Sequence, residues 1–307
     1  MRHLVVFVHG YVGAESDFDN MARGFALSST TLSPESSNVV ALKIATNLNT
    51  HDGVERGSVR IFKEIQKFVK DSGSAVDGGE ITEFSIVGHS LGGLYARFVI
   101  RLLDECGFFT TIRPRCFVTL ATPHLSIRRS PKSTLSVGWQ WVAQSLCQTT
   151  RELCLEDKHN LLLGMTEQHY LRALGRFDKR VLYSNVLNDQ MVHYSTASIS
   201  LRNPYSNPQY RQASPDFPSL TAWSLVNVKR RLKHDLPVPV TMFQNDLKQP
   251  LLTLMFDRLN ALEWERYDCL FYSVFAHEQI INKRQIFSGQ DVVQHLLTRV
   301  MFPNSNL

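Results

Sequence analysis

The sequence predicts an α/β fold in which a mostly parallel sheet is flanked by helices. Short apolar runs such as Leu4–Val8 and Cys116–Leu120 alternate along the chain with segments of helical periodicity. A run that is apolar at every position is typical of a parallel strand covered on both faces. Regular alternation of strands and helices indicates right-handed crossovers between parallel strands. The 307 residues are 43% hydrophobic, which is ordinary for a chain that buries a large core.

The expected elements follow in order along the chain. Helical spacing of apolar residues is clearest over Leu91–Leu102, where one face carries residues at i, i+3, i+4, i+7, i+8 and i+11. Other helices are expected from about Ser16, around Ile61–Val69 and around Val292–Val300. Strands are expected at Leu4–Val8, Val39–Ile44, Phe84–Val87, Cys116–Leu120, Arg180–Leu187 and Cys269–Phe275.

We expect a single domain over residues 1–307 with two excursions from the sheet. Residues 125–178 contain no evident strand, and we interpret them as a helical cap or lid over the site; an ordinary packed excursion is the alternative. Residues 200–266 form a variable insertion before the last strand. This insertion begins with a loop rich in proline, asparagine, glutamine and serine.

The charge pattern does not favour a nucleic-acid partner. The net charge is +5 and the pI is near 9.0, yet the basic residues are scattered. We interpret the two densest basic clusters as solvated surface, with contact to anionic lipid headgroups as the alternative. These clusters are Arg128, Arg129 and Lys132, and then Lys229, Arg230, Arg231 and Lys233.

Cysteine usage and the apolar runs predict a cytoplasmic protein. The five cysteines lack C-x-x-C spacing, so neither a zinc site nor a full disulfide framework is indicated. Leu4–Val8 is too short for the apolar region of a signal peptide, and no run of about 18 apolar residues occurs. Membrane contact is therefore expected only at the surface of a membrane or a lipid droplet.

A hexapeptide that begins at Gly88 has the features of a nucleophile elbow. The segment Gly88-His89-Ser90-Leu91-Gly92-Gly93 follows the apolar run Phe84–Val87 and opens the predicted helix. In such a turn the serine adopts a strained conformation that exposes its Oγ, and the flanking glycines let strand and helix pass closely. The context therefore predicts that Ser90 is a catalytic nucleophile.

A serine hydroxyl needs a histidine to accept its proton and a carboxylate to orient that histidine. In α/β-hydrolases these residues occur in the order serine, acid, histidine, with acid and base in loops beyond strands. Asp189 follows the Arg180–Leu187 strand, and His277 follows the expected last strand, so we assign them as acid and base. The alternatives weighed are His124, His193 and His295 for the base, and Asp178, Asp216 and Asp235 for the acid.

The developing oxyanion needs preorganised N–H donors. One is expected from Leu91, directly after the nucleophile. The second is expected from Tyr11, because His9-Gly10-Tyr11 follows the first strand and is similar to the His-Gly oxyanion motif of lipases. This chemistry requires no metal and no cofactor.

Several strings together resemble the lipase-like serine esterase family long catalogued as a domain of unknown function. The resemblance covers residues 1 to about 200 and Ala276-His277, and it implies an α/β-hydrolase with a serine, aspartate and histidine triad acting on acyl esters of glycerolipids. Where members commonly have a basic and a small residue followed by valine and proline, this chain has Gln190-Met191-Val192-His193. Residues 201–266 have no clear counterpart. The matching strings are Phe7-Val8-His9-Gly10, Gly88-His89-Ser90-Leu91-Gly92-Gly93, Leu120-Ala121-Thr122-Pro123-His124-Leu125 and Tyr183-Ser184-Asn185-Val186-Leu187-Asn188-Asp189.

The leading hypothesis is a serine hydrolase that cleaves ester bonds of lipids through an acyl-enzyme. Two alternatives stay open. A thioesterase or protein deacylase uses the same triad on a different leaving group, and an inactive lipid-binding regulatory module keeps the fold without the reaction.

Overall fold

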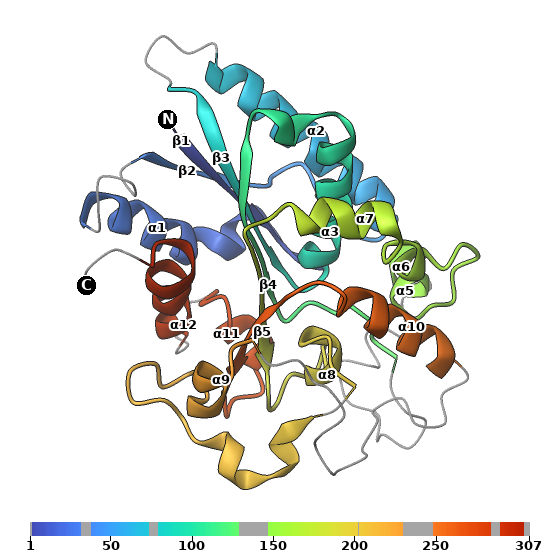
Figure 1. Ribbon diagram of the computed structural model, residues 1–307, viewed down its shortest axis with the longest axis vertical. Coiled ribbons are helices and arrows are strands. Elements are labelled where there is room, and N and C mark those ends of the chain that lie inside the picture. Colours follow the sequence, from blue (N-terminus) through green and yellow to red (C-terminus); the bar gives the residue numbers. More distant parts are fainter. Residues whose placement is uncertain are drawn as a thin grey trace.

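The computed structural model describes residues 2–31, 38–73, 79–128, 147–201, 203–229, 248–283 and 289–303. Within these ranges a six-stranded sheet has the order β2-β1-β3-β4-β5-β6, and every neighbouring pair of strands is parallel (Figure 1). The predicted class, an α/β fold with a mostly parallel sheet flanked by helices, is confirmed. The strands are β1 (Arg2–Val8), β2 (Val39–Lys43), β3 (Ile81–His89), β4 (Arg113–Leu120), β5 (Lys179–Asn185) and β6 (Glu265–Cys269).

Helices cover both faces of the sheet. Helices α2 (Val54–Gly73), α3 (Leu91–Glu105) and α7 (Gln168–Gly175) lie on one face, and α1 (Asp19–Thr31) and α12 (Gln290–His295) lie on the other (Figure 1). A short 3₁₀ turn, Glu15–Phe18, precedes α1, and a π-helix, Leu296–Met301, continues α12. The closing helix expected around Val292–Val300 is therefore present. The other α-helices of the described ranges are α5 (Gln148–Leu153), α6 (Leu161–Gly164), α8 (Tyr194–Ala197), α9 (Ala222–Val226), α10 (Gln249–Leu259) and α11 (Ala276–Gln279).

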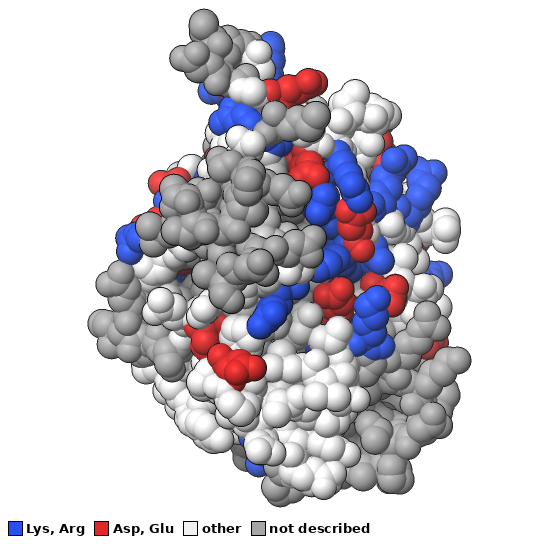
Figure 2. Space-filling view, turned by 60° about the vertical axis from the view of Figure 1, so that its left-hand side comes forward, with Lys and Arg blue, Asp and Glu red and all other residues white. Residues whose placement is uncertain are grey.

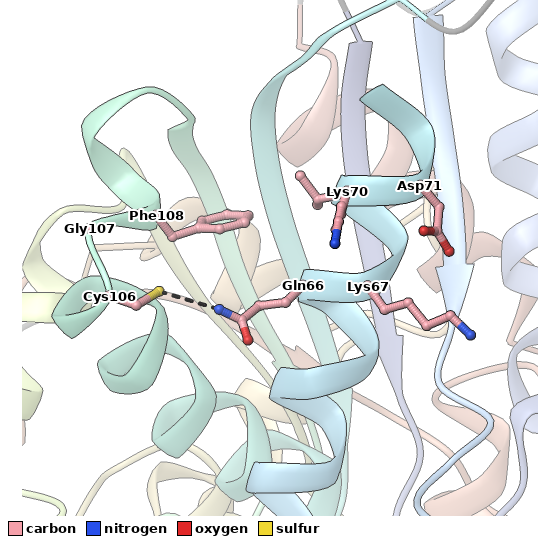
Figure 3. Close-up of a pocket in the computed structure, with 8 residues that line it drawn as sticks. Gln66, Lys67, Lys70, Asp71, Cys106, Gly107 and Phe108 are labelled. Carbon is pink, nitrogen blue, oxygen red and sulfur yellow. Dashed lines mark hydrogen bonds between the residues drawn. The ribbon is translucent and has the colours of Figure 1, made fainter. Parts of the chain in front are cut away.

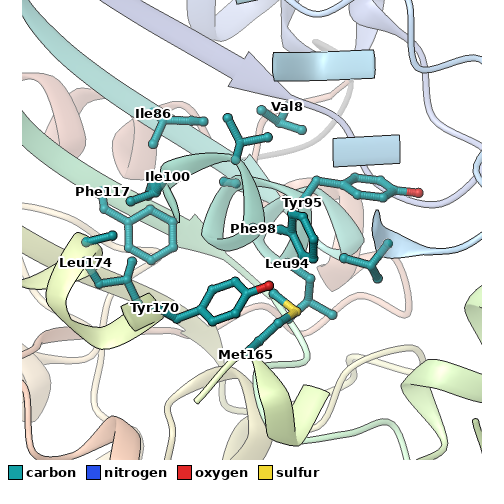
Figure 4. Close-up of a cluster of buried hydrophobic side chains, with 14 of the residues drawn as sticks. Val8, Ile86, Leu94, Tyr95, Phe98, Ile100, Phe117, Met165, Tyr170 and Leu174 are labelled. Atoms are coloured by element: carbon teal, nitrogen blue, oxygen red, sulfur yellow. The ribbon is translucent and has the colours of Figure 1, made fainter. Parts of the chain in front are cut away.

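The core consists of two layers because successive residues of a buried strand point to opposite faces. In β1, Leu4, Val6 and Val8 belong to the cluster beneath α2 and α3, whereas Val5 and Phe7 belong to the cluster beneath α1 and α12. Figure 4 shows the first cluster, in which Phe98 of α3 lies against Tyr170 of α7, whereas Tyr95 points away from them toward α2. Helix α3 is thus buried on most sides, which fixes the start of the helix relative to the sheet.

The prediction of the last strand at Cys269–Phe275 is wrong. The strand is Glu265–Cys269; Leu270 and Phe271 after it are buried outside the sheet, and the chain then enters a loop in which Tyr272 is 77% exposed. The error arises because β6 contains buried charged residues. The Arg266 guanidinium donates to the Ser198 carbonyl, and the Asp268 carboxylate accepts hydrogen bonds from Tyr194 and Tyr205.

The segment expected to form a helical cap contains helices in residues 147–178, whereas residues 125–128 are not helical. Residues 147–178 contain α5, α6 and α7, and residues 129–146 lie outside the described ranges. Arg97 of α3 is buried and ties this region to the elbow helix, because its guanidinium donates to the carbonyls of His124 and Met165. Burial lowers the pKa of Arg97 to about 10, so the side chain remains a cation at neutral pH.

The insertion over residues 200–266 packs against the end of the sheet. It contains two 3₁₀ turns, Pro204–Ser206 and Pro208–Arg211, followed by α9 and α10. The Tyr205 hydroxyl contacts Thr221 and also donates to Asp268 of β6. Residues 230–247, including part of the second basic cluster, lie outside the described ranges. None of the described helices is both long and apolar enough to cross a membrane.

The glycines of the elbow lie so close to neighbouring backbone atoms that no side chain could be accommodated. A Cβ on Gly92 would lie 2.0 Å from the Val8 carbonyl oxygen, and a Cβ on Gly88 would lie 2.5 Å from the Gly93 backbone. Strand β3, strand β1 and the start of α3 therefore pass at backbone contact distance. Only glycine permits this approach.

We expect Gly92→Ala to destabilise the protein by about 3 kcal/mol or more, because the added methyl group meets a backbone oxygen that cannot rotate away. The measurement is the free energy of unfolding in urea. Gly164→Ala is the matched control, since nothing lies within 4 Å of a Cβ at Gly164 and alanine is the better helix former. Equal unfolding midpoints for Gly92→Ala and the wild type would contradict the close approach.

Candidate active site

Ser90 occupies a sharp turn between β3 and α3. Its backbone has φ 54° and ψ −129°, a conformation that residues with a Cβ rarely adopt. Two bonds hold the strained residue in place: its N–H donates to the Leu120 carbonyl at 2.9 Å, and its carbonyl accepts from the Thr122 hydroxyl at 2.8 Å. The Ser90 side chain remains partly exposed. The turn therefore has the geometry predicted for a nucleophile elbow.

The loop after β1 lies directly against Ser90. A Cβ on Gly10 would be 2.8 Å from Ser90 Cβ and 3.3 Å from Ser90 Oγ. His9 is buried, and its Nδ1 bonds the Gly10 carbonyl at 3.1 Å, which helps to fix the loop. The Tyr11 hydroxyl is 2.8 Å from His51 Nδ1, so this side chain is also anchored.

Tyr11, Ser90 and Leu91 line one small cavity. Leu91 is the first residue of α3, and the opening N–H groups of a helix have no acceptor within it. The cavity has a volume of about 40 Å³. The structure thus brings both predicted oxyanion donors to the same cavity as the predicted nucleophile. The rest of the wall is formed by Pro123, Ile127, Thr150, Leu153, Met191 and Val192.

Asp189 lies in the loop after β5, where its carboxylate accepts several hydrogen bonds. The N–H groups of Met191 and Val192 donate to Oδ1 at 3.0 and 2.8 Å, and Asn185 Nδ2 donates to Oδ2 at 2.7 Å. Burial raises the pKa of Asp189, but the His277 ring and these N–H donors outweigh it, so the pKa is lowered overall. The carboxylate is therefore ionised at neutral pH.

His277 lies beside Asp189, with its Nδ1 2.9 Å from Oδ2 and 3.1 Å from Oδ1. Both side chains are buried. Burial lowers the pKa of His277, but the Asp189 carboxylate more than compensates and raises the pKa above the ordinary value of 6.5. Since His277 Nδ1 donates to the carboxylate, Nε2 is the nitrogen that can accept a proton.

The residue before Ser90 contacts the His277 ring, whereas Ser90 itself is not hydrogen-bonded to His277. His89, the residue before Ser90, contacts His277 with ring centroids 4.7 Å apart. No hydrogen bond joins the Ser90 hydroxyl to His277, although both residues lie in the described part of the chain. Such bonds are often long without substrate and tighten in the reacting complex.

The alternative bases have other contacts. His124 is buried, and its Nε2 bonds the Thr119 hydroxyl at 2.9 Å. His295 Nδ1 bonds the Tyr183 hydroxyl at 2.8 Å in the core beneath α12. His193 is the residue before α8, and its carbonyl accepts the Ala197 N–H. Neither these three histidines nor His277 lines the cavity that contains Ser90. His277 differs from the three in its bond to Asp189 and its ring contact with His89.

The alternative acids are also elsewhere. Asp178 precedes β5 and pairs with Arg113 and Arg115, and Asp216 is exposed. Asp235 lies outside the described residues. Among the described carboxylates, Asp189 is the one that bonds His277.

Sequence reasoning did not identify Asn185 as part of this arrangement. Its side-chain N–H₂ group donates both to Asp189 and to the Ala276 carbonyl, so it connects the acid loop to the histidine loop. Asn185 stands four residues before the acid at the end of β5, and that position was the only available signal. The spacing alone does not distinguish a bridging asparagine from a turn residue.

A larger, open surface pocket of about 790 Å³ lies near the far end of α3 (Figure 3). Gln66 and Lys70 of α2 face Cys106 and Phe108 across it, and Gln66 Nε2 is 3.9 Å from Cys106 Sγ. Helix α3 separates this pocket from Ser90 by fifteen residues, a distance of roughly 22 Å. This pocket contains none of the predicted site residues.

The molecular surface carries charges of both signs. On the face shown in Figure 2, Lys and Arg side chains are interleaved with Asp and Glu. Arg115, for example, pairs with Glu83 and Asp178. Within the described ranges, no group of three or more His, Cys, Asp or Glu side chains is arranged to hold a metal ion. The five cysteines form no disulfide.

Residues 1–200 match the family model described as "Putative serine esterase (DUF676)". Two similar yeast proteins are the putative lipase YDL109C of Saccharomyces cerevisiae, 33% identical over 129 residues, and the putative lipase C4A8.10 of Schizosaccharomyces pombe, 30% identical over 129 residues. These alignments cover 39% of this chain and 19% and 16% of the two relatives. The matched segment is thus less than a fifth of each relative.

Solved structures with related topology share little sequence with the chain. The product of the gene lin2722 from Listeria innocua is 12% identical, with a TM-score of 0.41 over 64% of this chain and 77% of that one. A fungal esterase from Rhizomucor miehei is 14% identical, with a TM-score of 0.39 over 60% of this chain and 57% of that one.

Proposed function

Because the chain belongs to the putative serine esterase family (DUF676), we propose that it is a serine hydrolase that cleaves carboxylic ester bonds of lipids. The observation that carries this proposal is the buried Asp189–His277 pair, whose imidazole contacts His89, the residue before a serine held in a strained elbow. Together the pair and the serine supply the parts of a charge-stabilised nucleophile.

In the proposed reaction, Ser90 Oγ attacks the ester carbonyl while His277 Nε2 accepts the hydroxyl proton. The N–H groups of Leu91 and Tyr11 stabilise the oxyanion. Collapse of the tetrahedral intermediate breaks the ester C–O bond, and the protonated His277 gives its proton to the leaving alcohol. Water then attacks the acyl-Ser90 ester with His277 as base, which releases the carboxylic acid and restores the serine. Asp189 orients His277 and stabilises its charged form throughout.

The cavity wall supports an acyl substrate. Leu91, Pro123, Ile127, Leu153 and Val192 supply apolar surface next to Ser90. The volume of about 40 Å³ is far below the roughly 300 Å³ at which pockets for larger ligands begin. A short acyl group therefore enters this conformation most readily, and we propose that a longer chain displaces the α5 side chains that close the cavity.

Hydrolysis of a substrate series tests the proposal. We expect p-nitrophenyl acetate and butyrate to be cleaved in solution, and dispersed long-chain acylglycerols to be cleaved faster once they exceed their aggregation point, because an interface favours exposure of the apolar wall. Rates on acyl thioesters measured in parallel test the thioesterase alternative. Faster cleavage of thioesters than of any oxygen ester would replace the proposed substrate class, and no cleavage of either class would overturn the enzymatic assignment.

A further inference from the structure

His89 contacts the loop that carries the catalytic histidine. It is the last residue of β3 and is 5% exposed, and its Nε2 lies 2.8 Å from the backbone carbonyl oxygen of His277. A carbonyl oxygen only accepts hydrogen bonds, so His89 Nε2 carries the proton and donates it. The two imidazole rings are also in contact, with an interplanar angle of 48°.

The segment around His277 has little local structure of its own. Helix α11 contains four residues, a single turn, and it follows the exposed stretch at Tyr272, Val274 and Phe275. One helical turn is not stable by itself. Two side chains from the sheet hold its first turn: His89 bonds the His277 carbonyl, and Asn185 bonds the Ala276 carbonyl.

We propose that His89 is a positioning residue, which holds the His277 carbonyl so that the imidazole stays between Asp189 and Ser90. The inference rests on the proposed function, because it assigns His89 to the same reaction. His89 also connects the nucleophile to the base. It is the last residue of β3, directly before the strained Ser90, and it bonds the backbone carbonyl of His277. A displacement of β3 would move both groups together.

The electrostatics at His89 suit this task. A charged imidazole in contact with His277 would oppose proton transfer from Ser90. Burial, together with the His277 and Lys283 charges, lowers the pKa of His89 well below 6.5, although the bond to the His277 carbonyl and Asp189 act in the opposite direction. His89 is therefore a neutral donor. The other charged groups that act on His277 are Asp189 and Glu278, which raise its pKa, and Lys283, which lowers it.

Two substitutions separate the hydrogen bond from the ring. His89→Phe keeps an aromatic ring of similar size without a donor, and His89→Gln keeps an N–H donor at similar reach. We expect His89→Phe to lower kcat about 5- to 100-fold, the range that corresponds to loss of one buried hydrogen bond, with KM little changed. His89→Gln should recover most of the loss. If His89 only fills space, the order of the two variants reverses.

The pKa of His277, measured by NMR titration of the folded protein, provides a second readout. We expect this pKa to fall in His89→Phe, because a less restrained imidazole loses contact with Asp189, and to recover in His89→Gln. His3→Phe is the matched control: His3 is also buried in the sheet, its Nε2 bonds Ser85 Oγ at 2.8 Å, and its pKa is lowered to about 4. This variant should lose thermal stability without moving the His277 pKa.

An unchanged His277 pKa in His89→Phe, or an equal change in His3→Phe, would overturn the assignment of His89. The titration needs no turnover, so it also separates this inference from the proposed function. A wild type that cleaves no ester would end the proposed function, whereas the titration would still decide whether His89 restrains His277.

Discussion

Ser90→Ala is expected to lower kcat for ester hydrolysis by about 10⁶-fold and to abolish covalent labelling by a fluorophosphonate. The reason is that the proposed nucleophile is the Ser90 hydroxyl. Ser90 adopts a backbone φ of 54° and lines the same cavity as Leu91 and Tyr11. Alanine retains the Cβ and its backbone strain, so the fold should be little affected. Rate measurements and mass spectrometry of the labelled protein provide the readouts.

Thr150→Ala is the matched control for this experiment. Thr150 is the other aliphatic hydroxyl residue in the wall of the same cavity, and its Oγ1 is 3.2 Å from Cys147 Sγ. Labelling and most of the activity should survive its removal. Label retained in Ser90→Ala would move the nucleophile elsewhere. A folded wild type that neither reacts with the probe nor cleaves esters would favour an inactive lipid-binding module.

The elbow could be predicted from sequence because its determinants are local. Gly88, Ser90 and Gly92 lie within five residues of each other, and the preceding apolar run places them at a strand end. The structure shows the backbone contacts that require those glycines. The parallel sheet flanked by helices follows equally from the alternation of strands and helices, since apolar runs such as Leu4–Val8 and Cys116–Leu120 mark strands covered on both faces.

The last strand was misplaced because its burial depends on distant partners. Arg266 and Asp268 are 2% and 0% exposed, and a sequence pattern assigns such residues to the surface. Their partners, Ser198 and Tyr205, stand more than sixty residues away. The stretch at 270–275 is more apolar, yet Tyr272, Val274 and Phe275 are exposed and only Leu270 and Phe271 are buried. The prediction of His277 as the base does not depend on this error, because the observed strand Glu265–Cys269 and the predicted strand Cys269–Phe275 both precede the loop that contains His277.

The residues around the site that were missed are connected by long-range contacts. His89 and His277 are 188 residues apart, and Asn185 and Ala276 are 91 apart. Nothing in the spacing of one sequence indicates that His89 would donate to a carbonyl rather than fill the variable position of an elbow. Local motifs identify the reacting groups, whereas the groups that orient them depend on tertiary packing.

Asp189→Asn is expected to lower kcat by about 10⁴-fold. An asparagine accepts the N–H groups of Met191 and Val192 as the carboxylate does, which holds the loop, but its N–H₂ group cannot accept the bond from Asn185 Nδ2. The amide, however, carries no charge to stabilise a protonated His277, and its N–H₂ group favours the wrong tautomer of the imidazole. Asp157→Asn is the control, because Asp157 is another buried carboxylate that accepts a backbone N–H, from Leu161 at 2.9 Å.

The pH dependence of kcat/KM should also change in Asp189→Asn, in a direction that follows from the pKa of His277. His277 must be neutral to accept the Ser90 proton, so the wild type loses activity when the pH falls below the His277 pKa. Because that pKa is raised above 6.5, the loss occurs at a pH above 6.5. In Asp189→Asn the carboxylate that raises the pKa is gone and burial, which lowers it, remains. The acid limb of kcat/KM should therefore move to lower pH while the plateau falls. A variant that keeps the wild-type acid limb, or loses less than tenfold in kcat, would show that a different group orients the base.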